Sequence, residues 1–284
     1  LAPGSGLLAC DRQGDGRMVE PLELELALES VRRRGCRRDW QGLRLLVTAG
    51  PTREALDPAR CLTNRSTGLM GVLLAQAARL RGASVDLVHG PLRVAPELLG
   101  GLRCHPIETA AELEATLERL QPEVQAIAMA AAVADHRLRI PRQHKLPKQE
   151  LESSLNEGWE AVPDLLAGLV ERRRQAREAS GSRPAWADQL ILGFAAETGD
   201  ALTTGQAKWR RKGCDLLFVN PVDRPEGGFG SDRNQGWLLG AGETPQWIEA
   251  DGKLAVAHRL LDGLIGLRPP GTGSAPHDPA AADP

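Results

Sequence analysis

The sequence predicts an α/β fold: a doubly wound, mostly parallel, Rossmann-like sheet with helices on both faces and a small antiparallel addition near the C-terminus. From Gly42 onward, short apolar runs alternate with segments of helical length, which is typical of such sheets. One run, residues 124–133 (VQAIAMAAAV), is almost continuously apolar, with Gln125 as the exception, as expected of a strand buried on both faces of a parallel sheet. Small or polar residues follow several of the strands, which suits a ligand beyond their carboxyl ends.

The first elements along the chain are a helix and a strand–loop–helix unit. In residues 22–34 leucines alternate with glutamates, which suits a strand, but Leu, Glu and Ala favour a short helix leading into a linker. The strand 43–47 breaks at Gly50, and a loop of Gly, Ser, Thr, Asn and Arg then leads to a helix at 68–81, which Gly82 ends. Such a unit is typical of an anion site; the alternative is a long surface loop in an ordinary βαβ unit.

The rest of the chain continues the alternation. Thr109 and Glu112 predict a capping box for a helix that runs to about residue 120. Residues 136–150 are basic and interrupted by proline, so we expect a mobile loop. The other expected elements are strands at 84–89, 151–155, 189–195 and 215–219, helices at 163–179 and 200–212, a turn at 227–230, an antiparallel pair at 235–239 and 246–249, a closing helix at 253–267, and a disordered tail at 268–284.

The composition narrows the class of protein. With 42% hydrophobic and 25% charged residues, the 284-residue chain can bury a sizeable core. Its five cysteines are odd in number and form no CxxC pair, which favours a reducing, cytoplasmic setting over a disulfide framework or a zinc knuckle. A net charge of −2 gives no reason to expect nucleic acid, and no apolar run suggests a membrane span.

Lysine is rare in this sequence. Only five of the 35 basic residues are lysines, and four of them form two close pairs, 145/148 and 208/212. Lysine is a compact point charge that commonly binds phosphate, whereas arginine is a planar fork. The surviving lysines are therefore candidate phosphate ligands; the alternative is chance survival on solvated surfaces.

Six segments carry a family resemblance. They are TAGPTREALDPARCLTNRSTGLMG, AMAAAVADHR, KLPK, GFAAET, AKWRRKGCDLLFVN and GGFGSDRN. In this order and spacing, from roughly Gly42 to Leu267, they resemble phosphopantothenate–cysteine ligase (phosphopantothenoylcysteine synthetase), the second half of the bacterial bifunctional coenzyme A biosynthesis protein. The resemblance implies a cytoplasmic ligase, with Mg²⁺, that joins 4′-phosphopantothenate to L-cysteine at the expense of CTP. It implies an acyl-cytidylate intermediate, release of pyrophosphate and CMP, and a homodimer.

The resemblance also implies roles for particular residues. Lys145 would form the acyl-cytidylate, Asn64 would handle that intermediate, and Arg60 would assist with it or with the substrate. Nucleotide binding is implied for Asp135, Lys145, Pro163, Asp164, Leu165, Leu166, Phe194, Lys208 and Lys212, contact with the acyl-cytidylate for Ala132, and a place in the pocket for Asn220 and Phe229. No metal ligands are implied, and we expect phosphates and water to hold the ion.

The first residues resemble a different enzyme. SGLLACDRQGDGRM is similar to the substrate clamp of a flavin-dependent decarboxylase, with Cys10 at the position of its catalytic cysteine. The rest of that decarboxylase, including its FMN site, is absent, so we expect no decarboxylation by this chain alone. The expected organisation is a decarboxylase remnant at 1–21, a linker at 22–41, the ligase domain at 42–267 and a tail at 268–284, associated with a decarboxylase domain in the full-length protein.

The sequence departs from the family pattern at several positions. Pro147 replaces a lysine in Lys145-Leu146-Pro147-Lys148, which affects the expected loop conformation. In the first motif Leu69 and Cys61 replace a frequent lysine and tyrosine, and in the clamp Asp11 replaces a glycine.

Two rival functions have their own sequence requirements. An NAD(P)-dependent dehydrogenase needs a tight GxGxxG after the first strand and an acidic residue at the end of the second, which here ends in His89-Gly90. A non-catalytic nucleotide-binding or regulatory member of the family is the second rival. The presence of Asn64 and Lys145 favours an enzyme.

Overall fold

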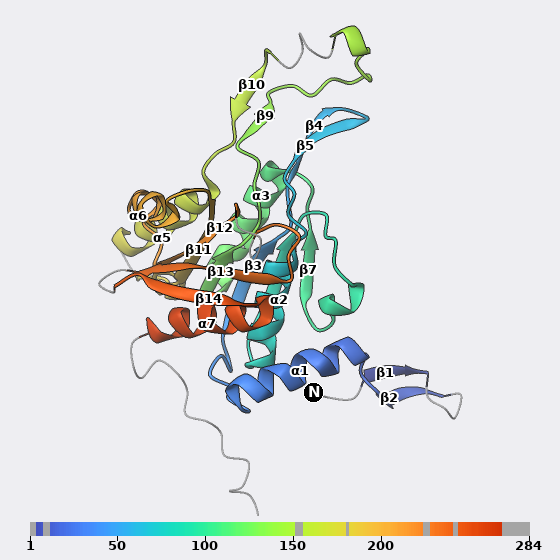
Figure 1. The fold of residues 1–284 in the computed structure, drawn as a ribbon, viewed down its shortest axis with the longest axis vertical. Coiled ribbons are helices and arrows are strands. Elements are labelled where there is room, and N and C mark those ends of the chain that lie inside the picture. Colours follow the sequence, from blue (N-terminus) through green and yellow to red (C-terminus); the bar gives the residue numbers. More distant parts are fainter. Residues whose placement is uncertain are drawn as a thin grey trace, which may run out of the picture.

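The structure, a computed structural model, describes residues 4–7, 12–150, 156–179, 182–223, 228–240 and 244–268. Its centre is an eight-stranded sheet in the order β14–β13–β12–β11–β8–β3–β6–β7 (Figure 1). Six neighbouring strands are parallel: β3 (Arg44–Ala49), β6 (Ser84–His89), β7 (Arg103–Pro106), β8 (Ala126–Met129), β11 (Leu190–Glu197) and β12 (Leu216–Pro221). The last two, β13 (Arg233–Gly240) and β14 (Gln246–Gly252), are antiparallel. The predicted fold class is confirmed.

Helices cover both faces of this sheet. One core contains the buried faces of α2 (Leu69–Leu80) and α7 (Lys253–Gly266), with α1 (Pro21–Arg34) packed against it. The other contains the buried faces of α3 (Ala110–Leu120), α5 (Leu165–Glu178) and α6 (Ala201–Lys212). Short 3₁₀ turns lie at η1 (Pro96–Leu99), η2 (Gln121–Glu123) and η3 (Ala185–Asp188). None of the helices within the described ranges is long and apolar enough to cross a bilayer.

The strand β3 shows why the parallel strands appear in the sequence as continuous apolar runs. Leu45 and Val47 belong to one core, whereas Leu46 between them belongs to the other. Successive side chains of a strand point to opposite faces, so a strand covered on both faces has no polar alternation. Two predictions about helix ends are also confirmed: the Thr109–Glu112 capping box forms, and Gly82 follows α2 with a φ of +97°.

One expected strand is shorter than predicted. The apolar run 124–133 forms ladder contacts only over Ala126–Met129, and residues 130–135 leave the sheet. They leave because their backbone groups bond to the segment after β3: the N–H of Ala132 donates to Gly50 O at 2.9 Å. Alanine and valine suit either arrangement, so composition did not mark the end of the strand.

Two hairpin arms extend from the sheet. The first, β4 (Arg53–Asp57) with β5 (Arg60–Thr63), replaces the loop expected after β3. The second, β9 (His136–Leu138) with β10 (Trp159–Ala161), borders the segment predicted as a mobile loop. Both arms lie beyond the upper edge of the sheet in Figure 1. The strand expected at 151–155 lies outside the described residues.

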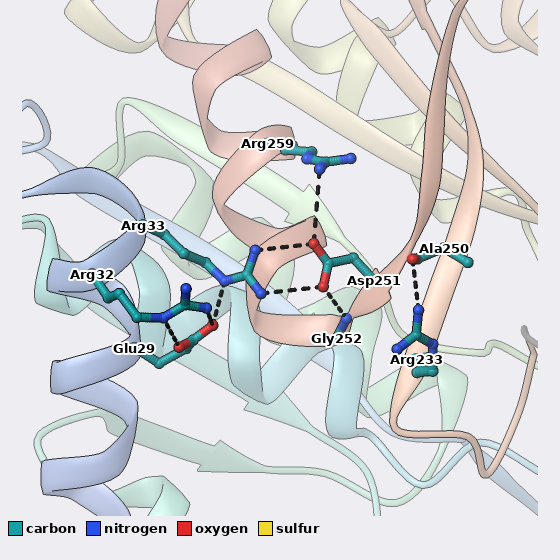
Figure 2. Close-up of polar contacts among 8 residues, drawn as sticks. All are labelled: Glu29, Arg32, Arg33, Arg233, Ala250, Asp251, Gly252 and Arg259. Atoms are coloured by element: carbon teal, nitrogen blue, oxygen red, sulfur yellow. Dashed lines mark hydrogen bonds and ion pairs between the residues drawn. The ribbon is translucent and has the colours of Figure 1, made fainter.

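The N-terminal elements are a hairpin, β1 (Gly4–Leu7) with β2 (Gln13–Arg17), and the helix α1. The Arg33 guanidinium donates to both carboxylate oxygens of Asp251, at 3.0 and 3.2 Å (Figure 2). The same carboxylate accepts the N–H of Gly252 at 2.8 Å and lies 3.7 Å from Arg259. The expected helix at 22–34 is therefore present, and it is tied to the junction between β14 and α7. Cys10, Asp11 and the tail after residue 268 lie outside the described ranges.

Candidate functional site

A cavity of about 650 Å³ lies at the carboxyl ends of the central strands. The chain runs outward from β3 to β6 and β7, then returns to β8 beside β3 and continues to β11 and β12. The switch point of the sheet is therefore between β3 and β8, where ligands bind in open α/β sheets. Met129 at the end of β8, Phe194 and Ala196 of β11 and Asn220 of β12 line the cavity. Its position is the one predicted from the small and polar residues that follow these strands.

Most of the residues implied by the resemblance line this one cavity. They are Asn64, Ala132, Asp135, Pro163, Asp164, Leu165, Leu166, Phe194, Lys208, Lys212, Asn220 and Phe229. These residues come from segments far apart in sequence, and the parallel topology brings them together. Arg60 and Lys145 are not among the residues that line the cavity.

Two buried threonines fix the wall formed by residues 130–135. The Thr48 hydroxyl accepts the N–H of Ala131 at 3.0 Å, and the Thr52 hydroxyl accepts the N–H of Ala134, also at 3.0 Å. Both threonine side chains are fully buried. Thr48 is one of the polar residues at the strand ends, whereas nothing in the neighbours of Thr52 in the sequence marks it as buried.

Asn64 lies against the same wall. Its Nδ2 donates to Ala132 O at 3.0 Å and to Val133 O at 3.3 Å. The opposite amide orientation would place Oδ1 against two carbonyl oxygens, so these contacts set the orientation. Oδ1 accepts no hydrogen bond from the described residues. Asn64 therefore orients the Ala132 segment and leaves an acceptor at the cavity.

The start of α5 forms another part of the wall. Asp164 caps this helix: its Oδ1 accepts the N–H of Ala167 at 3.1 Å. Leu165 and Leu166 are buried behind the cavity surface, and Phe194 packs edge-on against Phe218 with 5.7 Å between ring centroids. The cavity therefore has an apolar flank beside a helix N-terminus, a combination that suits a nucleotide.

The two lysines of α6 have carboxylate partners. Lys208 forms an ion pair with the buried carboxylate of Glu197, and Lys212 lies 2.5 Å from Asp164 Oδ2. Both line the cavity from one face of the helix, as their spacing of four predicted. Because each ammonium already faces a carboxylate, less positive charge is left here for a phosphate than the sequence alone suggests.

Arg60 and Lys145 lie on the arms. Arg60 donates to Leu146 O at 2.5 Å, and its Nε lies 3.1 Å from Asp57 Oδ2, which also accepts the N–H of Leu146 at 3.2 Å. Burial alone would raise the pKa of the Asp57 carboxyl, but the N–H groups of Ala59 and Leu146 and the Arg60 charge hold this pKa below its usual value. A charged Asp57–Arg60 pair thus fixes the backbone beside Lys145, whose own side chain is exposed.

The cavity also contains residues to which the sequence analysis gave no role. Lys253, Asn234 and Met70 line it from the side of α2 and α7. Lys253 is one of only five lysines, so its rarity also marks it as a candidate phosphate ligand. Its role was not predicted because it lies at the start of an expected helix and outside both lysine pairs.

No cluster that could hold a metal ion by itself occurs within the described ranges. Nowhere there do three His, Cys, Asp or Glu side chains gather at ligating distance. That phosphates and water hold Mg²⁺ stays a prediction.

Comparison with known proteins identifies the family. A family model described as “DNA/pantothenate metabolism flavoprotein C-terminal domain” matches residues 40–267. The chain is 37% identical over 281 residues to the “Coenzyme A biosynthesis bifunctional protein CoaBC” of Mycobacterium tuberculosis (strain ATCC 25618 / H37Rv). This match covers 93% of the chain but 62% of the relative, so the chain spans about three fifths of that protein's length.

Two solved structures are similar. The “C-terminal Domain of Coenzyme A biosynthesis bifunctional protein CoaBC” has a TM-score of 0.62 and 27% identity, and the match covers 81% of this chain and 97% of that one. “Cab2 mutant H337A complex with phosphopantothenate-cysteine” has a TM-score of 0.59 and 18% identity, with 86% of this chain and 91% of that chain covered; at this identity it shows the fold alone. Since the family model covers most of the sequence, the chain belongs to the family of the DNA/pantothenate metabolism flavoprotein C-terminal domain.

Proposed function

We propose that this chain is a phosphopantothenate–cysteine ligase, which joins 4′-phosphopantothenate to L-cysteine with CTP in coenzyme A biosynthesis. The observation that carries the proposal is the convergence of the motif residues on one cavity at the switch point. The name of the mycobacterial relative, a coenzyme A biosynthesis protein, supports the same pathway.

The reaction has two displacements. In the first, the carboxylate of phosphopantothenate attacks the α-phosphorus of CTP; the bond to the bridging oxygen breaks and pyrophosphate leaves. In the second, the amine of cysteine attacks the acyl carbon of the acyl-cytidylate, the C–O bond to the phosphate breaks and CMP leaves. A carboxylate accepts an amine only after a good leaving group is attached, so the site must hold two anions in line and exclude water.

Asn64 has a specific part in the second displacement. By holding the Ala132 and Val133 carbonyls, it fixes the backbone that faces the acyl group. Its remaining Oδ1 is an acceptor for the attacking amine. Asn64 does not donate to the acyl carbonyl oxygen in this arrangement, since both amide hydrogens are already donated.

Lys145 acts in the first displacement. We propose that the β9–β10 arm bends over the bound nucleotide and brings the Lys145 ammonium to the phosphates, while the arm excludes water. Arg60 contributes by holding Leu146, the next residue. Mg²⁺, which the phosphates would hold, would supply further positive charge against the negative charge of the reacting groups.

The proposal extends to the assembly. We propose a cytoplasmic homodimer that works beside a flavin-dependent decarboxylase domain in the full-length protein. Residues 1–284 alone are not expected to decarboxylate the product.

One assay separates the possible functions. The chain is incubated with 4′-phosphopantothenate, CTP, Mg²⁺ and cysteine, and pyrophosphate and phosphopantothenoylcysteine are measured. If the proposal holds, the two products form in equal amounts. Nucleotide binding without pyrophosphate release would instead identify a non-catalytic member of the family. Replacing CTP with ATP tests the choice of nucleotide, and NAD(P)H binding without CTP binding would favour a dehydrogenase.

A further inference from the structure

Lys253 is a buried lysine in the wall of the cavity. Only 4% of the residue is exposed, and its ammonium forms no hydrogen bond or ion pair with the residues that the structure describes. Burial lowers the pKa of this amine, and the charge of Asp232 opposes that effect only in part. Buried charges are normally paired, so an unpaired lysine in a cavity is a candidate ligand group.

The backbone holds Lys253 firmly at this position. Lys253 is the first residue of α7, and its N–H donates to Asp232 O at 2.9 Å. Just before it, Asp251 is held by Arg33 of α1 and accepts the N–H of Gly252 (Figure 2). A cation at the N-terminus of a helix is also opposed by the helix dipole. Burial, position and lack of a partner thus all disfavour the charge in the absence of a ligand.

Two further groups beside Lys253 can donate hydrogen bonds. Asn234 is 4% exposed, and its Nδ2 reaches only Met70 Sδ, a weak acceptor 3.7 Å away. The 12-residue helix α2 begins at the cavity after Gly68, which has no side chain to cap it. An ammonium, an amide and a helix N-terminus with partial positive charge therefore face one space.

This space is on the opposite side of the sheet from the paired lysines. Met70 packs against the core that contains α2 and α7, whereas Leu165 and Leu166 belong to the core that contains α5 and α6. The cavity thus has a charged group from each face of the sheet. On one side Lys208 and Lys212 already face carboxylates; on the other, Lys253 does not.

We propose that Lys253, together with the Asn234 amide and the N-terminus of α2, binds a phosphate group of a substrate. The assignment of the phosphate to a substrate rests on the proposed ligase function. In that reaction two molecules carry phosphates, CTP and 4′-phosphopantothenate. The bound phosphate provides the counter-charge that Lys253 otherwise lacks.

The test is direct binding, without turnover. Calorimetric titrations of the whole chain with Mg²⁺–pyrophosphate, with Mg²⁺–CTP and with 4′-phosphopantothenate are compared for wild type, Lys253→Met and Lys253→Arg. Loss of one charged hydrogen bond predicts binding weaker by about tenfold to a hundredfold in Lys253→Met, with partial recovery in Lys253→Arg. Arg119→Met, which removes an exposed positive charge of α3 outside the cavity, is the matched control and should bind as wild type does.

The three titrations distinguish the source of the phosphate. Weaker binding of pyrophosphate and CTP assigns Lys253 to the nucleotide, and weaker binding of phosphopantothenate alone assigns it to the other substrate. Unchanged affinity for all three probes, or no binding of any probe by wild type, overturns the proposal. The ligase assay is independent of these titrations. If the wild type releases pyrophosphate but Lys253→Met binds all three probes as the wild type does, the proposal for Lys253 is wrong and the ligase function is unaffected.

Folding is controlled separately. A structural lysine would lower the melting temperature when replaced, whereas removal of an unpaired buried charge should leave it equal or higher. If Lys253→Met does not fold, reductive ¹³C-methylation of the wild-type lysines gives a second measurement, with the Lys253 signal assigned by Lys253→Arg. A shift of that signal on addition of pyrophosphate or phosphopantothenate supports the proposal, and no shift with either overturns it.

Discussion

At the scale of single residues, Gly90 after β6 lies against the backbone of Pro51 after β3, and this close contact leaves no room for a side chain. A Cβ atom there would lie 1.8 Å from Pro51 O, which belongs to the segment after β3. We predict that Gly90→Ala lowers the free energy of unfolding by about 3 kcal/mol, since the clash involves backbone rather than a flexible side chain. Urea denaturation measures the effect. Gly266→Ala is the control: a Cβ there meets nothing within 4 Å, so this helical change should be neutral or slightly stabilising.

Asn64 can be tested by a change of one atom type. We predict that Asn64→Asp slows the second displacement more than the first, so that acyl-cytidylate accumulates. A carboxylate cannot donate to the Ala132 and Val133 carbonyls, and it repels them, so the backbone facing the acyl group shifts. Quenched reactions analysed for the intermediate measure this. If CTP is consumed and no intermediate builds up, the role assigned to Asn64 is wrong.

His258 links stability to pH. Both ring nitrogens are buried without a hydrogen bond within the described residues, and burial, then the charges of Arg81 and Arg34, lower its pKa to about 4. The unfolded chain takes up a proton near pH 6.5, before the folded one does. We therefore predict that the folded state loses about 3 kcal/mol as the pH falls from about 6.5 to 4.

The matched variant for this pH effect is His258→Leu, which cannot take up a proton. Denaturation at several pH values should show that the free energy of unfolding falls more steeply for the wild type than for His258→Leu between about pH 6.5 and 4. At higher pH the two proteins should show the same dependence of this free energy on pH. Equal slopes at all pH values would contradict the assignment.

At the scale of elements, Arg33 is one of several residues whose ion pairs hold α1 against the rest of the fold. Arg33 spans from α1 to Asp251, whereas its neighbour Arg32 pairs with Glu29 inside the helix (Figure 2). We predict that Arg33→Ala loosens α1 by about 1 kcal/mol and speeds tryptic cleavage between residues 32 and 38, since the pair is only partly exposed. Arg32→Ala removes one arginine from the same run without breaking the link, so its cleavage rate should stay close to that of the wild type.

The β9–β10 arm can be tested through Lys145. We predict that Lys145→Gln abolishes CTP consumption. Glutamine is neutral, so the variant lacks the positive charge that we propose Lys145 brings to the phosphates of CTP. Binding of CTP should weaken less than turnover, since the residue acts after the arm bends. Arg142→Gln, a change of charge on the same arm, is the control that should keep its activity. A normal rate of pyrophosphate release by Lys145→Gln would refute the role.

At the scale of the whole molecule, the sequence predicted the topology better than the connections. The strand expected at 84–89 formed with the expected bounds, and the Thr109 capping box formed, because both depend on nearby residues. Both arms were missed as hairpins. The residues of β4 and β5 are largely polar, and the buried residues of β4 are the charged Glu54 and Asp57, so no apolar period marked these strands.

The site was predicted in part for the same reason. Motif residues such as Asn64 and Phe194 were found through the family resemblance, and the cavity contains them. Carboxylate partners such as Glu197 for Lys208 depend on strands and helices that meet only in the fold. The absence of a partner at Lys253 is likewise a property of three dimensions, and a sequence can at most mark the residue as unusual.

Both arms emerge from the chain directly after the two strands that border the switch point, β3 and β8. Neither arm contributes a strand to the eight-stranded sheet. Insertions and deletions within the arms should therefore leave the sheet register intact. The sheet is then a constant scaffold, and the arms are the part of the molecule whose length and sequence can change without rebuilding the cavity.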